Sequence, residues 1–268
     1  MQHVARLSPG SGHPPWPAVE VRGLGHVYDG RDGSVPALAD IDLTVPAGRF
    51  TVIVGPSGCG KTSLLMMMAG LRTPTSGTLH CDGRPIPKPD PERVGVVFQE
   101  ASLYPWLTAV ENVEFPLVLK HSPRDERRAR AEQMLKLVGL EGFGGRYPHE
   151  LSGGMKQRVS IARGLVQDPP VLLMDEPFAA LDEQTRMTMG YELLRIWSET
   201  SKTVVFITHS LTEAVYLADE VLVMSARPGR ILDRVQIDLP RPRTYQMMAT
   251  DKFGQLRERI WQQIRDMP

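Results

Sequence analysis

The sequence of 268 residues contains only two cysteines, Cys59 and Cys81, and few aromatic residues. Two cysteines cannot form a disulfide framework, so we expect a protein of a reducing compartment. A membrane-spanning helix needs about 18 apolar residues, and the longest apolar run, near residues 64–71, is far shorter. Residues 1–17 also lack the apolar segment of a signal peptide. These absences predict a soluble, intracellular, globular protein.

An excess of one charge is also missing, because 31 Lys and Arg residues balance 31 Asp and Glu residues. A general nucleic-acid-binding protein normally carries a basic excess, so we expect no nucleic-acid partner. The 24 glycines and 23 prolines stay below the level that is typical of low-complexity chains. The length is sufficient for a large folded domain with a buried core.

Four nearly unbroken runs of apolar and β-branched residues predict strands that are buried on both faces, as in a parallel sheet. They are Phe50–Val54, Val94–Phe98, Val171–Met174 and Thr203–Ile207. Between Val19 and Val45, shorter alternating runs predict antiparallel strands with one exposed face. These runs are residues 19–21, 26–28 and 41–45, separated by glycine-containing turns.

Helical spacing of apolar residues predicts several helices. They are Thr62–Leu71, Pro123–Leu140, Met155–Val166, Leu211–Ala218 and Phe253–Asp266. The second and third predict an inserted helical segment at about residues 100–167. Short strands are expected at Val221–Met224 and near Ile231. The predicted organisation is a mobile tail at 1–17, a main domain at 18–240 and a C-terminal helical extension at 241–268.

The first apolar run leads into a segment that matches the phosphate-binding pattern G-x-x-x-x-G-K-[ST] between a strand and a helix. The segment is Gly55-Pro56-Ser57-Gly58-Cys59-Gly60-Lys61-Thr62, followed by Ser63. Glycines let backbone N–H groups surround an anion, and the helix N-terminus adds roughly half a positive charge. Lys61 can reach β- and γ-phosphate oxygens, and the Thr62 hydroxyl can bind Mg²⁺. Cys59 is better explained as a small buried filler within the loop.

Two adjacent carboxylates, Asp175 and Glu176, follow the third apolar run. Neighbouring strand residues point in opposite directions, so we expect the two carboxylates to have different roles. Asp175 would hold Mg²⁺ through water, and Glu176 would polarise the attacking water. The alternative is a structural charge pair in a turn that Pro177 closes, which is less favoured opposite a phosphate loop.

Three further residues have both a functional and a structural explanation. His209, after the fourth run, would face the γ-phosphate, or it is a hydrogen-bonded structural histidine. Gln99, after the second run, can bind Mg²⁺ and orient water, or it is simply solvated. Tyr28 can stack on adenine or pack within the antiparallel strands, and its position alone does not decide between these.

A second anion site is predicted where Ser152, Gly153 and Gly154 begin a helix. Ser152 is a good N-cap, and the paired glycines weaken a helix start but expose its N–H groups. This helix N-terminus is therefore suited to an anion. Because the chain has one phosphate loop, the phosphate would belong to a second copy bound head to tail. Such a pair is a two-fold dimer with shared sites.

In the order of its motifs, the sequence resembles the ATPase subunits of ABC transporters. The motifs are GPSGCGKT, the Gln of VVFQE, LSGGMKQR, VLLMDEP, Ala180-Leu181-Asp182 and Thr208-His209, within about Val19 to Leu232. The resemblance implies an α/β P-loop NTPase with a RecA-like core, an N-terminal antiparallel β subdomain and an inserted α-helical subdomain. It also implies ATP and Mg²⁺ as ligands, and a homodimer that closes over two ATP molecules.

The resemblance also implies a role for each matching residue. Glu176 is the catalytic base, His209 the switch histidine, and Lys61 a catalytic contact to phosphate. The implied nucleotide-binding residues are Tyr28, Gly55, Pro56, Ser57, Gly58, Cys59, Gly60, Lys61, Thr62, Ser63, Gln99, Ser152, Gly153, Gly154 and Asp182, and those for Mg²⁺ are Thr62, Gln99 and Asp175. The Ser152 segment would contact the γ-phosphate of the partner's ATP, and Asp182 would lie at the dimer interface. Met155 replaces the commoner Gln of LSGGQ, as it does in several importer branches.

Longer stretches narrow the resemblance to the nitrate, sulfonate and taurine importers. They are QEASLYPWLTAVENV, DEPFAALDEQTR and THSLTEAVYLADEVLVMSARPGRI. The segment Tyr104–Leu107 would form part of a groove for a membrane permease, or it packs as an aromatic cluster within the helical insertion. This branch implies uptake of a small oxyanion, a permease, an indirect solute-binding partner and a position at the cytoplasmic face of the membrane. The alternatives are an importer of a thiamine-type pyrimidine, an ABC ATPase acting on nucleic acid or the ribosome, and another P-loop enzyme such as a small-molecule kinase.

Overall fold

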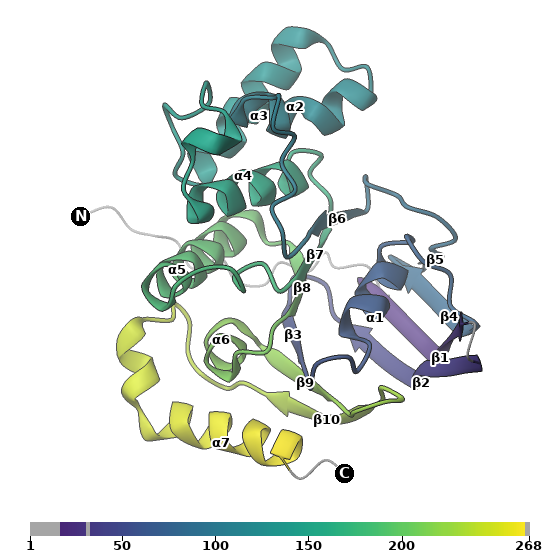
Figure 1. Ribbon diagram of the computed structural model, residues 1–268. Coiled ribbons are helices and arrows are strands. Elements are labelled where there is room, and N and C mark those ends of the chain that lie inside the picture. Colours follow the sequence, from purple (N-terminus) through teal and green to yellow (C-terminus); the bar gives the residue numbers. More distant parts are fainter. Residues whose placement is uncertain (1–16, 31–32, 266–268) are drawn as a thin grey trace.

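A six-stranded sheet forms the centre of the protein, in a computed structural model that describes residues 17–30 and 33–265 (Figure 1). The strand order is β10-β9-β3-β8-β7-β6. The strands are β3 (Phe50–Val54), β6 (Val94–Val97), β7 (Val171–Asp175), β8 (Thr203–Ile207), β9 (Glu220–Met224) and β10 (Ile231–Gln236). All neighbouring pairs are parallel except β9 and β10. The prediction that the four apolar runs form a parallel sheet is confirmed.

Both faces of this sheet are buried, because alternate residues of each central strand enter different cores. In β8, Val204 and Phe206 belong to the core that also contains residues of α4 (Gly153–Leu165), α5 (Glu183–Thr200), α6 (Leu211–Leu217) and α7 (Asp251–Arg265). Val205 and Ile207 belong to the core beneath helix α1 (Lys61–Met68). A strand with apolar neighbours on both sides needs an unbroken apolar sequence, which is the pattern that predicted it.

A second, antiparallel sheet with the order β2-β1-β4-β5 covers part of the central sheet from one side (Figure 1). Its strands are β1 (Val19–Gly30), β2 (Gly33–Val45), β4 (Ser76–Cys81) and β5 (Arg84–Pro85). The runs at 19–21 and 26–28, which the sequence predicted as separate strands, are both part of β1. The register of β1 against β2 shifts after Val21 and again after Leu24, and this irregularity interrupts the alternation.

Helix α1 (Lys61–Met68) lies between the two sheets. Its Leu64, Leu65 and Met68 are buried in the same core as strands β1 and β2. The helix ends three residues before its predicted end, because Gly70 adopts a φ of +70°. A left-handed residue after the last turn is a common helix stop, and glycine adopts it without steric penalty.

Three helices lie between β6 and β7, at the top of Figure 1. They are α2 (Ala109–Leu119), α3 (Arg124–Leu137) and α4 (Gly153–Leu165), with a short 3₁₀ helix η1 (Pro148–Glu150) before α4. Helices α3 and α4 match predicted segments, whereas α2 was not expected from the sequence. The boundaries expected for the tail, the main domain, the helical insertion and the C-terminal extension, at residues 18, 100, 167 and 241, stay predictions. Residues 1–16 of the predicted tail lie outside the described residues.

The remaining helices pack on the face of the central sheet opposite α1. They are α5 (Glu183–Thr200), α6 (Leu211–Leu217), the 3₁₀ helix η2 (Tyr245–Ala249) and α7 (Asp251–Arg265). Phe253 and Ile260 fix α7 to the core. In the described part of the chain, every helix is too short or too polar to cross a membrane.

Candidate functional site

The segment Gly55–Thr62, called the phosphate loop below, joins β3 to α1. Gly58 and Gly60 have φ angles of +77° and +99°. A Cβ at Gly60 would lie 2.6 Å from a methyl group of Leu38, so any side chain there would collide with β2. Gly60 is also the N-cap of α1 and offers no side chain to bond the first amides of the helix. These amides are thus available to an anion.

Lys61 is buried, with 6% of its surface exposed. Its Nζ donates hydrogen bonds of 2.9 Å to the carbonyl oxygens of Gly55 and Pro56. The same Nζ lies 3.8 Å from the Sγ of Cys59, which is almost fully buried. The ammonium group is therefore held over the loop. There its positive charge and the amides of the loop can attract the same anion.

Asp175 lies opposite the loop, at the last position of β7. The Thr62 hydroxyl donates a hydrogen bond of 3.2 Å to its Oδ1. Burial raises the pKa of Asp175, against the Thr62 hydrogen bond and the charge of Lys61, which lower it. A carboxylate beside a hydroxyl fits Mg²⁺, which binds one or two carboxylates and completes its shell with water and phosphate oxygens. The described residues contain no group of three or more His, Cys, Asp or Glu side chains suited to a metal.

The side chain of Glu176 contacts a different residue from that of Asp175, as the alternation of strand side chains predicts. The Nδ1–H of His209 donates to its Oε2 at 3.0 Å. Glu176 has a φ of +43°, a conformation that is strained for a residue with a side chain. Its amide donates to Ile207 of β8, and its carbonyl accepts from Ala179, so two backbone bonds hold this conformation. The two backbone bonds hold the Glu176 backbone, and the His209 contact holds its carboxylate.

Part of the phosphate loop and Glu176 line a cavity of about 520 Å³, a volume in the usual range of small-molecule sites. Its lining residues are Tyr28, Val35, Ala37, Ser57, Gly58, Gly60, Lys61, Thr62, Ser63, Glu176 and Arg227. Tyr28 is 37% exposed, and its hydroxyl bonds to Ser63 Oγ at 2.7 Å. The Arg72 guanidinium lies 4.8 Å from the centre of the Tyr28 ring. This fixed, partly exposed ring at the cavity favours the interpretation of Tyr28 as an adenine-stacking residue.

Among the described residues, Asp175 and His209 bond to the cavity residues Thr62 and Glu176, whereas Gln99 has no hydrogen bond to a cavity residue. It is exposed beyond the end of β6, the outermost strand of the sheet. It is not among the described residues that line the cavity. The geometry of this chain therefore gives no contact that favours Gln99 as a Mg²⁺ ligand over a solvated side chain.

The Ser152 segment does not reach the cavity either. Ser152 caps α4 by accepting from the Met155 amide at 3.3 Å, and both Ser152 and Gly153 are exposed. A Cβ at Gly154 would lie 3.0 Å from Thr185, so this glycine lets α4 approach α5 closely. Asp182 is exposed and caps α5 by accepting from the Thr185 amide at 3.0 Å. Close packing thus explains Gly154, but it does not explain the exposed Ser152 and Gly153.

Arg227 is a cavity residue that sequence reasoning missed. It lies in the turn after β9, and its Nε donates to the carbonyl oxygen of Gly58 at 2.9 Å. The exposed guanidinium is a cation that faces the same cavity as Lys61. The signal in the sequence is weak, because a lone arginine in an Arg-Pro-Gly turn is also typical of a surface loop.

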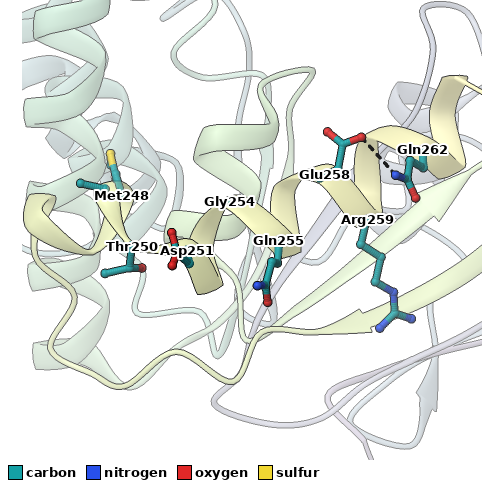
Figure 2. A pocket seen from close by; sticks show the side chains of 9 residues that line it. Met248, Thr250, Asp251, Gly254, Gln255, Glu258, Arg259 and Gln262 are labelled. Atoms are coloured by element: carbon teal, nitrogen blue, oxygen red, sulfur yellow. Dashed lines mark hydrogen bonds between the residues drawn. The ribbon is translucent and has the colours of Figure 1, made fainter.

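A larger, open groove of about 660 Å³ runs along α7 (Figure 2). Figure 2 shows polar side chains such as Gln255 and Glu258 projecting from one helix, with Glu258 bonded to Gln262. None of the predicted site residues lines it. The phosphate-loop cavity, where several elements bring ionisable groups together, is the better candidate site.

Comparisons with known proteins identify the family of the chain. The family model described as ABC transporter matches residues 38–179, just over half of the chain. The nitrate import ATP-binding protein NrtD of Synechocystis is 46% identical over 90% of this chain and 93% of that protein. The taurine import ATP-binding protein TauB of Yersinia pestis is 47% identical over 82% of this chain and 84% of that protein. A solved dimeric ATP-binding cassette bound to ADP and phosphate is 33% identical, with a TM-score of 0.73 over 83% of this chain and all of that one.

The chain therefore belongs to the ABC transporter family, as its motifs implied. It is an ATP-binding and ATP-hydrolysing subunit with the fold of a P-loop NTPase. The predictions of fold class, of family and of ATPase activity are confirmed.

Proposed function

We propose that two copies of this chain bind two ATP·Mg²⁺ in shared sites, and that hydrolysis drives import of a small oxyanion through a membrane permease. One observation carries the proposal. The phosphate loop, Asp175, Glu176 and His209 form one incomplete site, while Ser152 and Asp182 are exposed away from it. A second copy bound head to tail completes each site with the Ser152 segment of the other.

Within each site, the phosphate-loop amides and Lys61 bind the phosphates, and Tyr28 stacks on the adenine. Thr62 and Asp175 hold Mg²⁺, which supplies charge neutralisation to the phosphate oxygens when bound. Glu176 accepts a proton from the attacking water. His209 orients the Glu176 carboxylate and faces the γ-phosphate. Gln99 would be a further Mg²⁺ and water ligand, as the resemblance implies, although it does not line the cavity in this structure.

The dimer is supported by the exposed first turn of α4. Ser152 and Gly153 present a helix N-terminus to solvent, where an anion is stabilised by the amides and the helix dipole. Asp182 lies close by, since Gly153 and Gly154 pack against residues 181–185. One partner surface can therefore contact the Ser152 segment and Asp182 together. The similar solved cassette is a dimer, which supports a dimer of this chain.

The membrane partner is supported by the aromatic segment before α2. Trp106 is 70% exposed, whereas Tyr104 packs against Phe115 with ring centroids 4.5 Å apart. Trp106 and Phe115 also line a cavity with several arginines and acidic residues. Exposed aromatic surface of this kind is typical of an interface. Docking of a permease here places the chain at the cytoplasmic face of the membrane, with a solute-binding protein outside.

Relatives named for nitrate and taurine import support an oxyanion as the transported solute. A thiamine-type pyrimidine is the alternative among importers. An ABC ATPase acting on nucleic acid is a further alternative, which the balanced charge does not favour.

The experiment is uptake of labelled nitrate, taurine and an alkanesulfonate by cells that lack this chain. Cells complemented with the native chain are compared with cells complemented with Lys61→Ala. Uptake of one anion that requires Lys61 supports the proposal, and the permease should co-purify with the chain. Uptake that is the same in all these cells, together with salt-sensitive binding of RNA or DNA to the purified chain, would favour the nucleic-acid alternative.

A further inference from the structure

Glu213, in α6, is a partly buried carboxylate outside the nucleotide site, with 12% of its side chain exposed. Its Oε2 accepts a hydrogen bond of 2.6 Å from the Thr208 hydroxyl. That hydroxyl in turn accepts from the Ser210 amide at 2.9 Å, so its single proton is directed at Glu213. Thr208 and Ser210 flank His209, and Glu213 therefore anchors the backbone on both sides of the histidine.

Arg186, in α5, connects Glu213 to the other loop of the site. Its Nε lies 3.4 Å from Glu213 Oε1, in an ion pair that is largely shielded from water. Its Nη2 donates to the carbonyl oxygen of Leu181 at 3.0 Å. Leu181 immediately precedes Asp182, the exposed residue of the expected dimer interface. One guanidinium thus binds the loop after β7 and the carboxylate that anchors His209.

Burial raises the pKa of Glu213, whereas the hydrogen bond from Thr208 and the charge of Arg186 act to lower it. A largely shielded ion pair such as that of Glu213 and Arg186 is weak evidence of a role in stability alone, since apolar side chains of similar size often serve as well. The start of α6 has its own cap, because the Ser210 hydroxyl accepts from the Glu213 amide at 3.3 Å. The helix start therefore does not depend on the Glu213 side chain.

We propose that Glu213 and Arg186 are positioning residues for ATP hydrolysis, which hold His209 in line with Glu176 and tie it to the Asp182 loop. The inference rests on the proposed roles of Glu176, His209 and the dimer interface. Closure of a second copy on Asp182 then reaches His209 through Leu181, Arg186 and Glu213. The Glu176–His209 hydrogen bond is the end of this path.

The test measures ATP hydrolysis and equilibrium ATP binding on the purified full-length chain, with each rate divided by the number of ATP-binding sites. Glu213→Gln retains an acceptor for Thr208 but removes the charge that faces Arg186. Thr208→Val removes the donor, and Thr208→Ser keeps it. The matched control is Glu199→Gln, which breaks an exposed ion pair with Arg195 on α5, remote from the loops.

We expect Glu213→Gln and Thr208→Val to lower kcat per site by about tenfold or more, because small misplacements of catalytic groups have effects of this size. The KM and the equilibrium affinity for ATP should stay within about twofold of the native values, since neither residue lines the cavity. Thr208→Ser should restore the native rate, and Glu199→Gln should retain it. Adding Arg186→Gln to Glu213→Gln should lower kcat no further, because the two residues act as a unit.

A purely structural role would reduce the number of ATP-binding sites and leave kcat per site unchanged, and that result would overturn the inference. The same holds if Thr208→Ser behaves like Thr208→Val. Two other results would refute the proposed function itself, whatever the result for Glu213. The native chain would not hydrolyse ATP, or Glu176→Gln would hydrolyse it at the native rate.

Discussion

Replacement of Glu176 by glutamine tests the chemistry of the site with little change in its shape. The glutamine side chain has almost the same size, and its amide oxygen can still accept the hydrogen bond that His209 now donates at 3.0 Å. The Glu176 side chain is only 22% exposed, so water replaces its function poorly. What is lost is the capacity to take a proton from water.

A positioned general base contributes about 10²- to 10⁴-fold to a rate, which corresponds to roughly 3–5 kcal/mol of activation free energy. We therefore expect Glu176→Gln to lower the single-turnover rate of ATP hydrolysis by that factor. ATP affinity should change by less than about threefold, because the phosphate contacts come from the phosphate loop and Lys61. Rapid-quench kinetics with radiolabelled ATP measures the rate, and fluorescent-nucleotide titration measures the affinity.

Adding His209→Ala to Glu176→Gln shows whether His209 acts through Glu176 or acts on the phosphate independently. If His209 acts through Glu176, the double variant should be no slower than Glu176→Gln alone. A rate for Glu176→Gln within about fivefold of the native rate would refute the assignment of the base. The reasoning would also fail if the loss of rate were matched by an equal loss of ATP affinity.

Three further predictions concern binding and stability. Arg227→Ala should weaken ATP binding by about three- to tenfold, because one charge-assisted contact is lost. The kcat at saturating ATP should stay normal, and nucleotide titration measures the affinity. Phe206→Ala should lower the free energy of unfolding by about 3–5 kcal/mol in urea titrations, because Phe206 is fully buried between Phe50 and Phe178. Asp90→Asn should lower it by at most about 1 kcal/mol at pH 7, because the ion pair with Arg93 is partly exposed. The hydrogen bond from Arg93 lowers the pKa of Asp90, so this stabilisation is fully present above the ordinary Asp pKa. The difference in stability between variant and native chain should disappear as the pH falls through the lowered pKa.

The sequence predicted best those parts of the fold in which local pattern and tertiary role coincide. Residues 203–207 are apolar without interruption because β8 is buried on both faces, and so short an apolar run is typical of such a strand. The phosphate loop needs glycine where the backbone is left-handed or close to β2, so its spacing is visible in the sequence.

The elements that were missed lack such a pattern. Helix α5 is rich in polar residues and contains Gly190, which lowers helix propensity by about 1 kcal/mol. Packing does not require this glycine, because a Cβ there would make an ordinary van der Waals contact of 3.7 Å with the Tyr216 ring of α6. Strand β4 begins with Ser76, Gly77 and Thr78, all exposed, and is a strand only because β1 pairs with it.

Site residues that act through distant contacts were also not predictable. Arg227 meets Gly58 from a position 169 residues away in the chain. The sequence placed Glu213 only within a helix, because its contacts to Arg186 and Thr208 depend on how α5 and α6 pack. Tyr28 and Gln99 were ambiguous in the sequence, and their different exposure to the cavity is a property of the folded chain alone.

The most direct test of the shared site is a cross-link between two copies. Ser57 of the phosphate loop and Ser152 of α4 are both accessible to solvent, whereas the native Cys59 and Cys81 are buried. Chains with Ser57→Cys and Glu176→Gln are mixed with chains that carry Ser152→Cys and Glu176→Gln, under mild oxidation. Our account predicts a disulfide between the two chains with ATP and Mg²⁺, and little or none with ADP or without nucleotide. An equal yield with and without ATP, or no intermolecular disulfide under any condition, would contradict it.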